Sequence, residues 1–375
     1  MSETPDLCVV GHPFAPIGMG THGRAAIRAL RAARLSPGVV DIYGMDRRRD
    51  AGLEAEFAPL LAPGLSPRTN LFCINADEVE PTLARMDAGA FASAYNIIYP
   101  AWELARYPEP WARILERFDE VWAPSAFVAD AITPAVARPV LHMPLSVEPR
   151  LGSFLGRRYF AIPEHSFAML FSFDFSSYAQ RKNPGAVLEV FERLVARRPE
   201  AALHCVIKFK GGDPEHPTAK ALMARIAALG GRAQALTREL SDDEMGNLVR
   251  NVDAFVSLQR SEGFGFGMAE AMALGRVAAA TGYSGNLDFM TPETSRLVDY
   301  RLVPVGPDDY PYPDDQVWAE PDLDQAVAIL EALLDDPVEL RALGGRARRH
   351  MRTHFSHRAS GLRYAARLGE LAAKA

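Results

Sequence analysis

The clearest absence in this sequence is lysine, which does not occur before residue 182. Only five of the 41 lysine and arginine residues are lysines, at positions 182, 208, 210, 220 and 374, so arginine carries nearly all of the positive charge. Lysine presents a compact point charge, which suits a phosphate group. Each lysine in so arginine-rich a chain is therefore a candidate phosphate ligand, and chance placement explains any single one equally well.

Cysteine and long apolar runs are also scarce. Cys8, Cys73 and Cys205 lie far apart in apolar runs, which predicts buried thiols and argues against disulfides and metal sites. No stretch approaches the roughly 18 consecutive apolar residues of a membrane span, and the N-terminus lacks the basic start of a secretory signal. We therefore expect a cytoplasmic protein with at most peripheral membrane contact. A formal net charge of -6 argues against nucleic acid as a partner.

What is present is the composition of a folded protein with two domains. The chain of 375 residues is long for one compact core, and 48% hydrophobic with 23% charged residues argues against disorder. Short apolar runs alternate with helix-like segments, which predicts parallel sheets covered by helices, an α/β protein. The expected strands are residues 7–11, 39–41, 71–74, 96–99, 120–123, 167–173, 203–209, 254–258 and 277–281, and the expected helices are 24–33, 184–198, 268–274, 323–334 and 357–373.

A proline-bounded, extended stretch at 144–149 predicts the linker between the domains. We expect an N-terminal domain at residues 1–148 and a C-terminal domain at 149–355. The amphipathic helix within 356–375 is expected to pack back on the N-terminal domain. The proline-rich piece 304–321 is expected to be an ordered excursion.

A glycine pattern near the N-terminus fits the G-x-G-x-x-G fingerprint of dinucleotide-binding proteins. It comprises Gly18, Gly20 and Gly23, and Asp41 ends the next predicted strand. The fingerprint should follow the first strand at once, whereas seven residues separate Gly11 from this pattern's first spacer, Met19. An NAD-dependent oxidoreductase is thus a lesser alternative, and so is a turn without a ligand. Backbone amides at a helix N-terminus still favour an anion, so Gly18 and Gly20 remain candidates for donor binding.

The segment from 254 to 286 is more specific. A predicted strand is followed by Glu262, by three alternating glycines at 263, 265 and 267, and by a helix that we expect to carry Glu270 in its first turn. Open α/β sheets bind ligands beyond the carboxyl ends of their strands. Carboxylates suit ribose or sugar hydroxyls, and amides at a helix N-terminus suit a diphosphate. The alternative is that Glu270 merely caps its helix and that Glu262 is solvated.

With these residues the chain resembles the retaining GT-B glycosyltransferases of family 4, also called glycosyl transferases group 1. The matching motifs are Glu262-x7-Glu270 with Gly263-Phe264-Gly265, residues 269–275 and residues 281–290. The resemblance implies two Rossmann-like, doubly wound domains that face a central cleft. It further implies that Glu262 binds the donor sugar and Glu270 the ribose. Gly263, Phe264, Gly265 and Phe266 then lie at the donor.

The resemblance also implies a basic loop for the leaving diphosphate, at residues 172–184. Lys182 fits the lysine of this loop, and either Arg181 or Lys208 supplies the second cation. In the N-terminal domain the stretches 102–104 and 121–125 resemble a subgroup of the family, which implies that Glu103 faces the acceptor. His22 is a second candidate on the acceptor side.

We therefore expect a glycosyltransferase that needs no metal and no cofactor. The donor is a GDP-, UDP- or dTDP-sugar, and the acceptor is a glycan, a lipid-linked molecule or a small molecule, with polysaccharide biosynthesis as the frequent setting of the family. The nucleotide base is expected near residues 236–243. Two alternatives stay open, a GT-B epimerase or phosphorylase and a binding protein that keeps the pocket without transfer.

Overall fold

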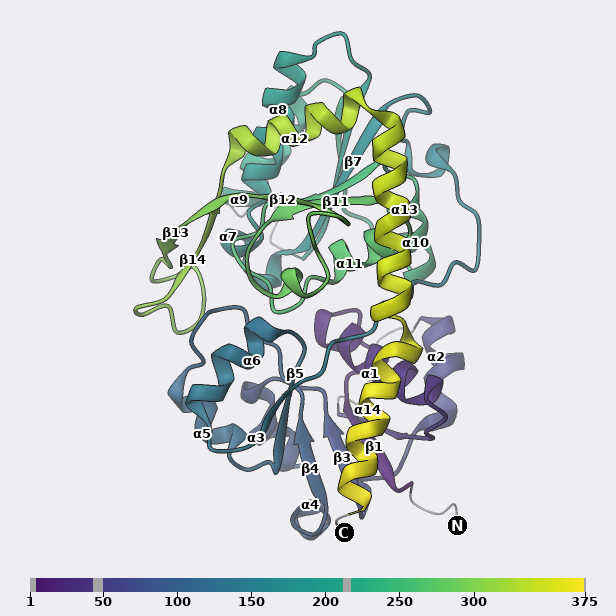
Figure 1. Ribbon diagram of the computed structural model, residues 1–375, viewed down its shortest axis with the longest axis vertical. Coiled ribbons are helices and arrows are strands. Elements are labelled where there is room, and N and C mark those ends of the chain that lie inside the picture. The colour runs from purple at the N-terminus through teal and green to yellow at the C-terminus, as the bar shows by residue number, and fades with distance from the viewer. Residues whose placement is uncertain (1–4, 43–49, 212–216, 374–375) are drawn as a thin grey trace. The chain divides into compact units, whose positions relative to one another are not determined.

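The chain folds into two compact units, shown in a computed structural model that describes residues 5–42, 50–211 and 217–373 (Figure 1). The first unit combines Met1–Val147 with Thr353–Ala375, and the second unit comprises Glu148–Arg352. The division thus falls inside the extended stretch 144–149. Of the stretches discussed above, residues 1–4 and Lys374 lie outside the described residues.

The sheet of the first unit is parallel and has the strand order β2-β1-β3-β4-β5-β6. Its strands are short apolar runs, and most of their residues are buried, as expected for a parallel sheet covered on both faces. They are β1 (Leu7–Gly11), β2 (Gly38–Asp41), β3 (Thr69–Phe72), β4 (Tyr95–Ile98), β5 (Glu120–Ala123) and β6 (Val140–His142).

The described residues of the first unit contain seven α-helices around this sheet, and the last of them comes from the far end of the chain. They are α1 (Gly18–Ala32), α2 (Ala51–Phe57), α3 (Ala76–Leu83), α4 (Ala88–Ser93), α5 (Glu109–Leu115), α6 (Ala126–Ile132) and α14 (His357–Ala372). Helix α14 packs along α1. The hydroxyl of Tyr364 donates to the carbonyl of Pro144 at 2.9 Å, and Arg367 pairs with the fully buried Glu120. These contacts join α14 to the centre of the first unit.

The second unit repeats the design with the strand order β12-β11-β10-β7-β8-β9, again all parallel. The strands are β7 (Phe167–Asp174), β8 (Leu203–Lys210), β9 (Ala233–Leu236), β10 (Ala254–Ser257), β11 (Val277–Thr281) and β12 (Arg296–Val298). The helices are α7 (Ala179–Lys182), α8 (Pro184–Arg197), α9 (Pro217–Ala228), α10 (Asp242–Arg250), α11 (Phe266–Ala273), α12 (Leu323–Asp335) and α13 (Pro337–His354).

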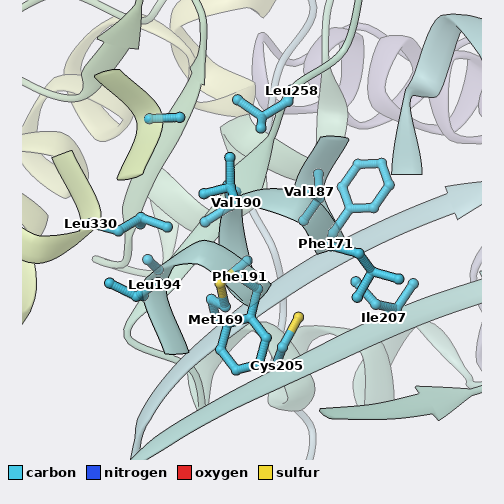
Figure 2. Packing of buried hydrophobic residues seen from close by; sticks show 14 of the residues in the cluster. Met169, Phe171, Val187, Val190, Phe191, Leu194, Cys205, Ile207, Leu258 and Leu330 are labelled. Atoms are coloured by element: carbon cyan, nitrogen blue, oxygen red, sulfur yellow. The ribbon is translucent and has the colours of Figure 1, made fainter. Parts of the chain in front are cut away.

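The core of the second unit lies between its sheet and the amphipathic helix α8. Phe191 of α8 lies beside Met169 of β7 and Cys205 of β8, and Val187 of α8 lies beside Phe171 of β7 (Figure 2). Helix α12 packs against α8 and adds Leu330, among other residues, to the same cluster. Pro184 stands at the first position of α8, where its missing N–H costs no helical hydrogen bond.

An antiparallel hairpin interrupts this regular pattern between β12 and α12. Its strands are β13 (Tyr300–Pro304) and β14 (Val317–Pro321), and a connection of residues 305–316 joins them. The hairpin forms a separate two-stranded sheet that projects from the side of the second unit (Figure 1). It occupies most of the proline-rich piece for which the sequence predicts an ordered excursion.

The sequence predicted only part of the observed elements, since helices α2 to α7, α9, α10 and α13 and strands β13 and β14 were not predicted. Helix α1 begins at Gly18 and not at Arg24, so the glycine pattern lies inside the helix. Strands β6, β9 and β12 were not predicted, because each has only three or four residues, too few for a periodic pattern to show. The three cysteines are buried free thiols, as predicted, and burial raises the pKa of Cys8 to about 11.

Candidate functional site

The second unit brings its candidate residues to the edge of the sheet where the strand order reverses. Strand β7 lies between β8 and β10, so the connections that follow β7 and β10 leave on opposite sides. Such a switch point, beyond the carboxyl ends of the strands, is where open α/β sheets bind ligands. Arg181 and Lys182 follow β7, and Glu262 follows β10.

The turn that carries the two cations is held by unusual backbone conformations at both ends. Tyr178 has φ 63° and ψ 97°, and Asn183 has φ 53° and ψ 50°. Between them, α7 makes a single helical turn. The Asn183 side chain donates to the carbonyl of Leu258 at 3.0 Å, which ties this turn to the exit of β10. Positive φ values at non-glycine residues persist where surrounding contacts enforce them, and they concentrate at functional sites.

The side chains of Arg181, Lys182 and Glu262 form one buried ion cluster. Lys182 Nζ lies 2.5 Å from Oε1 of Glu262, and Arg181 Nη1 lies 3.3 Å from Oε2. Arg181 also donates to the carbonyls of Ser261 at 2.8 Å and Ser177 at 3.1 Å. Burial alone raises the pKa of Glu262, but the two cations outweigh it and hold that pKa below its usual range. Glu262 is therefore a buried carboxylate, and the solvated alternative is wrong.

The backbone around Glu262 is fixed by the segment that follows β11. The amide of Glu262 donates to Oγ of Ser284 at 2.8 Å, and the amide of Gly285 donates to the carbonyl of Glu262 at 2.9 Å. A β-carbon at position 285 would lie 2.2 Å from the carbonyl oxygen of Gly263, so only glycine fits there. The two sequence motifs, at 262–270 and 281–290, thus form one interlocked structure.

The glycine-rich stretch after Glu262 leads into helix α11. Gly265 precedes the helix with φ 101°, and no side chain caps this N-terminus. Phe264 is buried with its ring 5.1 Å from that of Phe289, so it supports the loop from inside. Phe266 is half-buried and lies 5.4 Å from Phe264. Gly263, the first residue of this stretch, is buried.

Glu270 lies two residues farther into α11 than predicted, beyond the first turn. The helix begins at Phe266, so Glu270 is its fifth residue, and the first turn contains no acidic side chain. The prediction failed because the helix starts two residues before Met268, directly after Gly265. Glu270 is half-buried, and it does not cap its helix, since the N-cap is Gly265.

Lys208 belongs to a different group of charges. It lies two residues before the end of β8 and is buried. Its ammonium donates to the carbonyl of Phe209 at 3.2 Å. Burial lowers its pKa, and the nearby charge of Lys210 lowers it further, whereas Asp174 and Glu239 oppose this shift. Arg181, in contrast, shares the carboxylate of Glu262 with Lys182.

The first unit has its own switch point, because β1 lies between β2 and β3. Gly18 is exposed at the start of α1, and a β-carbon at Gly20 would lie 2.2 Å from the carbonyl of Ala15. His22 is buried with its ring edge against Tyr99 at 4.2 Å, and burial lowers its pKa to about 3, so it is neutral. Glu103 is half-buried in the segment that follows β4.

The described residues contain neither a cluster of metal-binding side chains nor a helix that could span a membrane. In the chain outside residues 1–4, 43–49, 212–216 and 374–375, no three His, Cys, Asp or Glu side chains are grouped as a metal site requires. Over the same part of the chain, no helix has the length and apolar character needed to cross a membrane.

Some residues that shape this site were not predicted. Ser284 and Gly285 belong to the motif at residues 281–290, but the sequence predicts no role for either of them. The close contact between positions 285 and 263 explains why residue 285 is a glycine. Arg260 and Tyr310 contact the segment of Arg181, but no local pattern in the sequence points to either contact.

Comparison with known proteins agrees with this geometry. Residues 169–299, about a third of the chain, match the sequence model of the glycosyl transferases group 1 family. They contain most of β7, the ion cluster and strands β8 to β12. No curated protein matches the chain significantly.

Solved structures match far more of the chain at low identity. HepE of Anabaena, in complex with UDP and glucose, superposes with a TM-score of 0.70 at 12% identity over 98% of this chain and 100% of its own. Sucrose-phosphate synthase from Thermosynechococcus elongatus gives 0.70 at 15% identity, with 100% of both chains covered. TarM from S. aureus gives 0.58 at 12% identity over 80% of this chain, and this chain spans only 54% of TarM. The protein thus has the GT-B fold of two doubly wound α/β units, and its second unit contains a segment that matches the glycosyl transferases group 1 family.

Proposed function

We propose that this protein is a retaining glycosyltransferase that moves a sugar from a nucleoside-diphosphate sugar to a glycan, lipid-linked or small-molecule acceptor. The cluster of Arg181, Lys182 and Glu262 at the switch point beside β7 is the observation that supports this most strongly. Two fixed cations at this edge of the sheet suit a diphosphate. The match of residues 169–299 to a glycosyltransferase family supports the same reaction class.

Different residues of the second unit bind different parts of the donor. Lys182 and Arg181 bind the diphosphate, together with the amides of residues 263–266 at the start of α11. Glu262 has two oxygens, each facing a cation, and its remaining lone pairs accept hydroxyl groups of the donor sugar. Glu270 accepts the ribose hydroxyls. Arg181 is preferred to Lys208 as the second cation because Arg181 and Lys182 share one carboxylate.

The reaction breaks the bond between the anomeric carbon of the sugar and the phosphate oxygen, and the electron pair leaves with the nucleoside diphosphate. The acceptor hydroxyl oxygen bonds to the anomeric carbon on the same face, and its proton passes to the departing phosphate oxygen. Negative charge grows on the leaving group, so fixed cations and amides stabilise the transition state. No protein nucleophile, metal ion or cofactor is part of this proposal.

The donor and the acceptor are proposed only as classes. The HepE structure holds UDP and glucose, so UDP-sugars are the first donors to test, followed by GDP- and dTDP-sugars. We assign the acceptor to the first unit, with Glu103 and His22 as candidate contacts. Polysaccharide assembly is the proposed setting.

The experiment is a panel of UDP, GDP and dTDP in a thermal-shift assay, followed by hydrolysis and transfer assays with the matching sugars. Binding of one nucleoside diphosphate stabilises the second unit, by about 2.7 kcal/mol at a hundredfold excess over Kd. Turnover with retained anomeric configuration supports the proposal. Binding without turnover on any acceptor would instead identify a non-catalytic binding protein, and stabilisation by NAD alone would favour an oxidoreductase.

A further inference from the structure

The β13–β14 hairpin lies outside the motifs at residues 172–184, 262–270 and 281–290. It nevertheless contacts the turn that carries Arg181 and Lys182. One contact comes from the connection between its strands, and the other comes from β14. The first reaches α7, the single turn between Tyr178 and Asn183, directly, and the second reaches it through Arg260.

The first contact is made by Tyr310, whose side chain is buried. The guanidinium of Arg181 lies 5.8 Å from the centre of the Tyr310 ring, within the range of a cation–π interaction. The ring of Tyr178 meets Tyr310 edge-on at 4.8 Å. Tyr310 therefore packs both on the cation and on the residue whose backbone is held at φ 63° and ψ 97°.

The second contact passes through Arg260. The Arg260 guanidinium donates to Oε2 of Glu320 at 2.8 Å from Nε, and it lies 5.5 Å from the ring centre of Trp318. The amide of Ala319 donates to the carbonyl of Arg260 at 2.9 Å. Arg260 is thus held by three consecutive residues of β14.

Arg260 in turn binds the end of α7. Its Nη1 donates to the carbonyl of Gln180 at 2.7 Å, and its amide donates to the carbonyl of Arg181 at 2.8 Å. The last carbonyls of a helix have no partner within the helix and need one from outside. Arg260 supplies partners for two of them, while Glu320 and Trp318 keep Arg260 in place.

A helix of one turn does not form by itself, because too few hydrogen bonds compensate for its nucleation. The position of α7 is therefore set by these outside contacts. A displacement of about 1 Å at a catalytic group can reduce a rate by roughly a hundredfold.

We propose that the β13–β14 hairpin is a positioning element, in which Tyr310 and the Arg260–Glu320 pair hold Arg181 and Lys182 in place for the diphosphate of the donor. The inference rests on the proposed function. Tyr310, Arg260 and Glu320 act through the two cations, so they are positioning residues and not catalytic ones.

The test compares Tyr310→Ala with Tyr310→Phe, Glu320→Gln and the control Leu302→Ala, whose side chain is 54% exposed on β13. Affinities for UDP and UMP, for GDP and GMP, and for dTDP and dTMP are measured by calorimetry. We expect Tyr310→Ala and Glu320→Gln to reduce the diphosphate-to-monophosphate affinity ratio about tenfold. Tyr310→Phe keeps the ring, so it and Leu302→Ala should retain the ratio within about twofold. A general loss of structure would lower both affinities and leave their ratio unchanged.

Hydrogen exchange of the free protein gives a second readout that needs no nucleotide. The amides of residues 182 and 183, which bond within the α7 turn, should exchange at least tenfold faster in Tyr310→Ala and remain unchanged in Leu302→Ala. If the wild-type protein binds none of the three diphosphates, the proposed function fails. If it binds one and the ratio and the exchange are both unchanged in Tyr310→Ala and Glu320→Gln, this inference alone is overturned.

Discussion

The two units use the same sheet topology but treat charge at their switch points differently. Beside β1 of the first unit, Arg24 donates to the carbonyl of Ala15 at 2.9 Å, and His12 pairs with Glu78 at 2.7 Å. Beside β7 of the second unit, two cations meet at Glu262. The backbone thus forms a comparable switch point in each unit. The charges of the side chains at each switch point determine which of the two suits a diphosphate, and the variants below test that difference.

The largest expected effect comes from removing the lysine of the second unit's cluster. Lys182→Ala should lower turnover about a hundredfold to a thousandfold, because an oxyanion-stabilising group of this kind contributes about 2.7–4 kcal/mol to the transition state. Steady-state kinetics with the donor that the panel identifies measures this loss. Lys220→Ala, on the exposed side of α9, is the matched control and should keep wild-type turnover. Near-normal turnover of Lys182→Ala would refute the assigned task.

The next largest effect should be on the stability of the first unit alone. Arg367→Ala leaves the fully buried Glu120 without its cation, and it should lower the free energy of unfolding of that unit by about 3 kcal/mol. Trp122 still donates to Glu120 at 2.6 Å, which places the expected cost at the lower end. Urea unfolding followed by both tryptophan fluorescence and nucleotide binding separates the units. Arg363→Ala, exposed on the same helix, should change little, and a parallel loss of nucleotide binding would contradict the separation.

A matched pair of glycine substitutions compares the switch points directly. Gly285→Ala and Gly20→Ala each bring a β-carbon to 2.2 Å from a backbone carbonyl, of Gly263 and Ala15 respectively. Both should destabilise the protein by about 2 kcal/mol, since the chain must shift to relieve the clash. Gly285→Ala also displaces the backbone beside Glu262, so it should weaken nucleoside-diphosphate binding about tenfold. Equal weakening in Gly20→Ala would remove the distinction between the two places.

The smallest effect concerns the pH dependence of the first unit. Burial lowers the pKa of His22 to about 3 from an ordinary 6.5, so between these values the unfolded chain binds a proton that the folded chain does not. Stability therefore falls as the pH drops below 6.5, by about 1 kcal/mol at pH 5.5. His22→Gln should flatten this slope in urea titrations between pH 7 and pH 5. An unchanged slope would indicate that His22 has the same pKa in the folded and the unfolded protein.

Much of this fold could be predicted from the sequence because parallel strands are buried on both faces. Strands β1 and β11 appear as uninterrupted apolar or small-residue runs, and β5 is apolar after its first residue, Glu120; the observed ends of all three agree with the predicted ones. The start of α1 could not be placed, because glycine normally weakens a helix. At Gly20 a close approach of the Ala15 carbonyl requires glycine within the helix, and this contact is not visible in local sequence.

The site was predictable where its residues are close in sequence, and less so where they meet from afar. Glu262 and the glycines after it form a local pattern, and Lys182 was singled out by a resemblance, but the ion pairs that join Lys182 and Arg181 to Glu262 were not predicted. The contacts of Arg260 with Glu320 and of Arg181 with Tyr310 join residues 60 and 129 positions apart. Neither pair has a spacing that signals contact, so both became visible only in the structure.

The return of α14 to the first unit has a consequence for biosynthesis. Residues 148–352 interrupt the first unit, so its α14 leaves the ribosome after the whole second unit. The second unit is contiguous and can fold during synthesis as its own cooperative unit. Until Tyr364 and Arg367 arrive, Glu120 lacks its cation and the α1 surface that α14 covers stays open to solvent. The first unit, although synthesised first, is thus completed last, and in that interval it is the part of the nascent chain most open to chaperones and proteases.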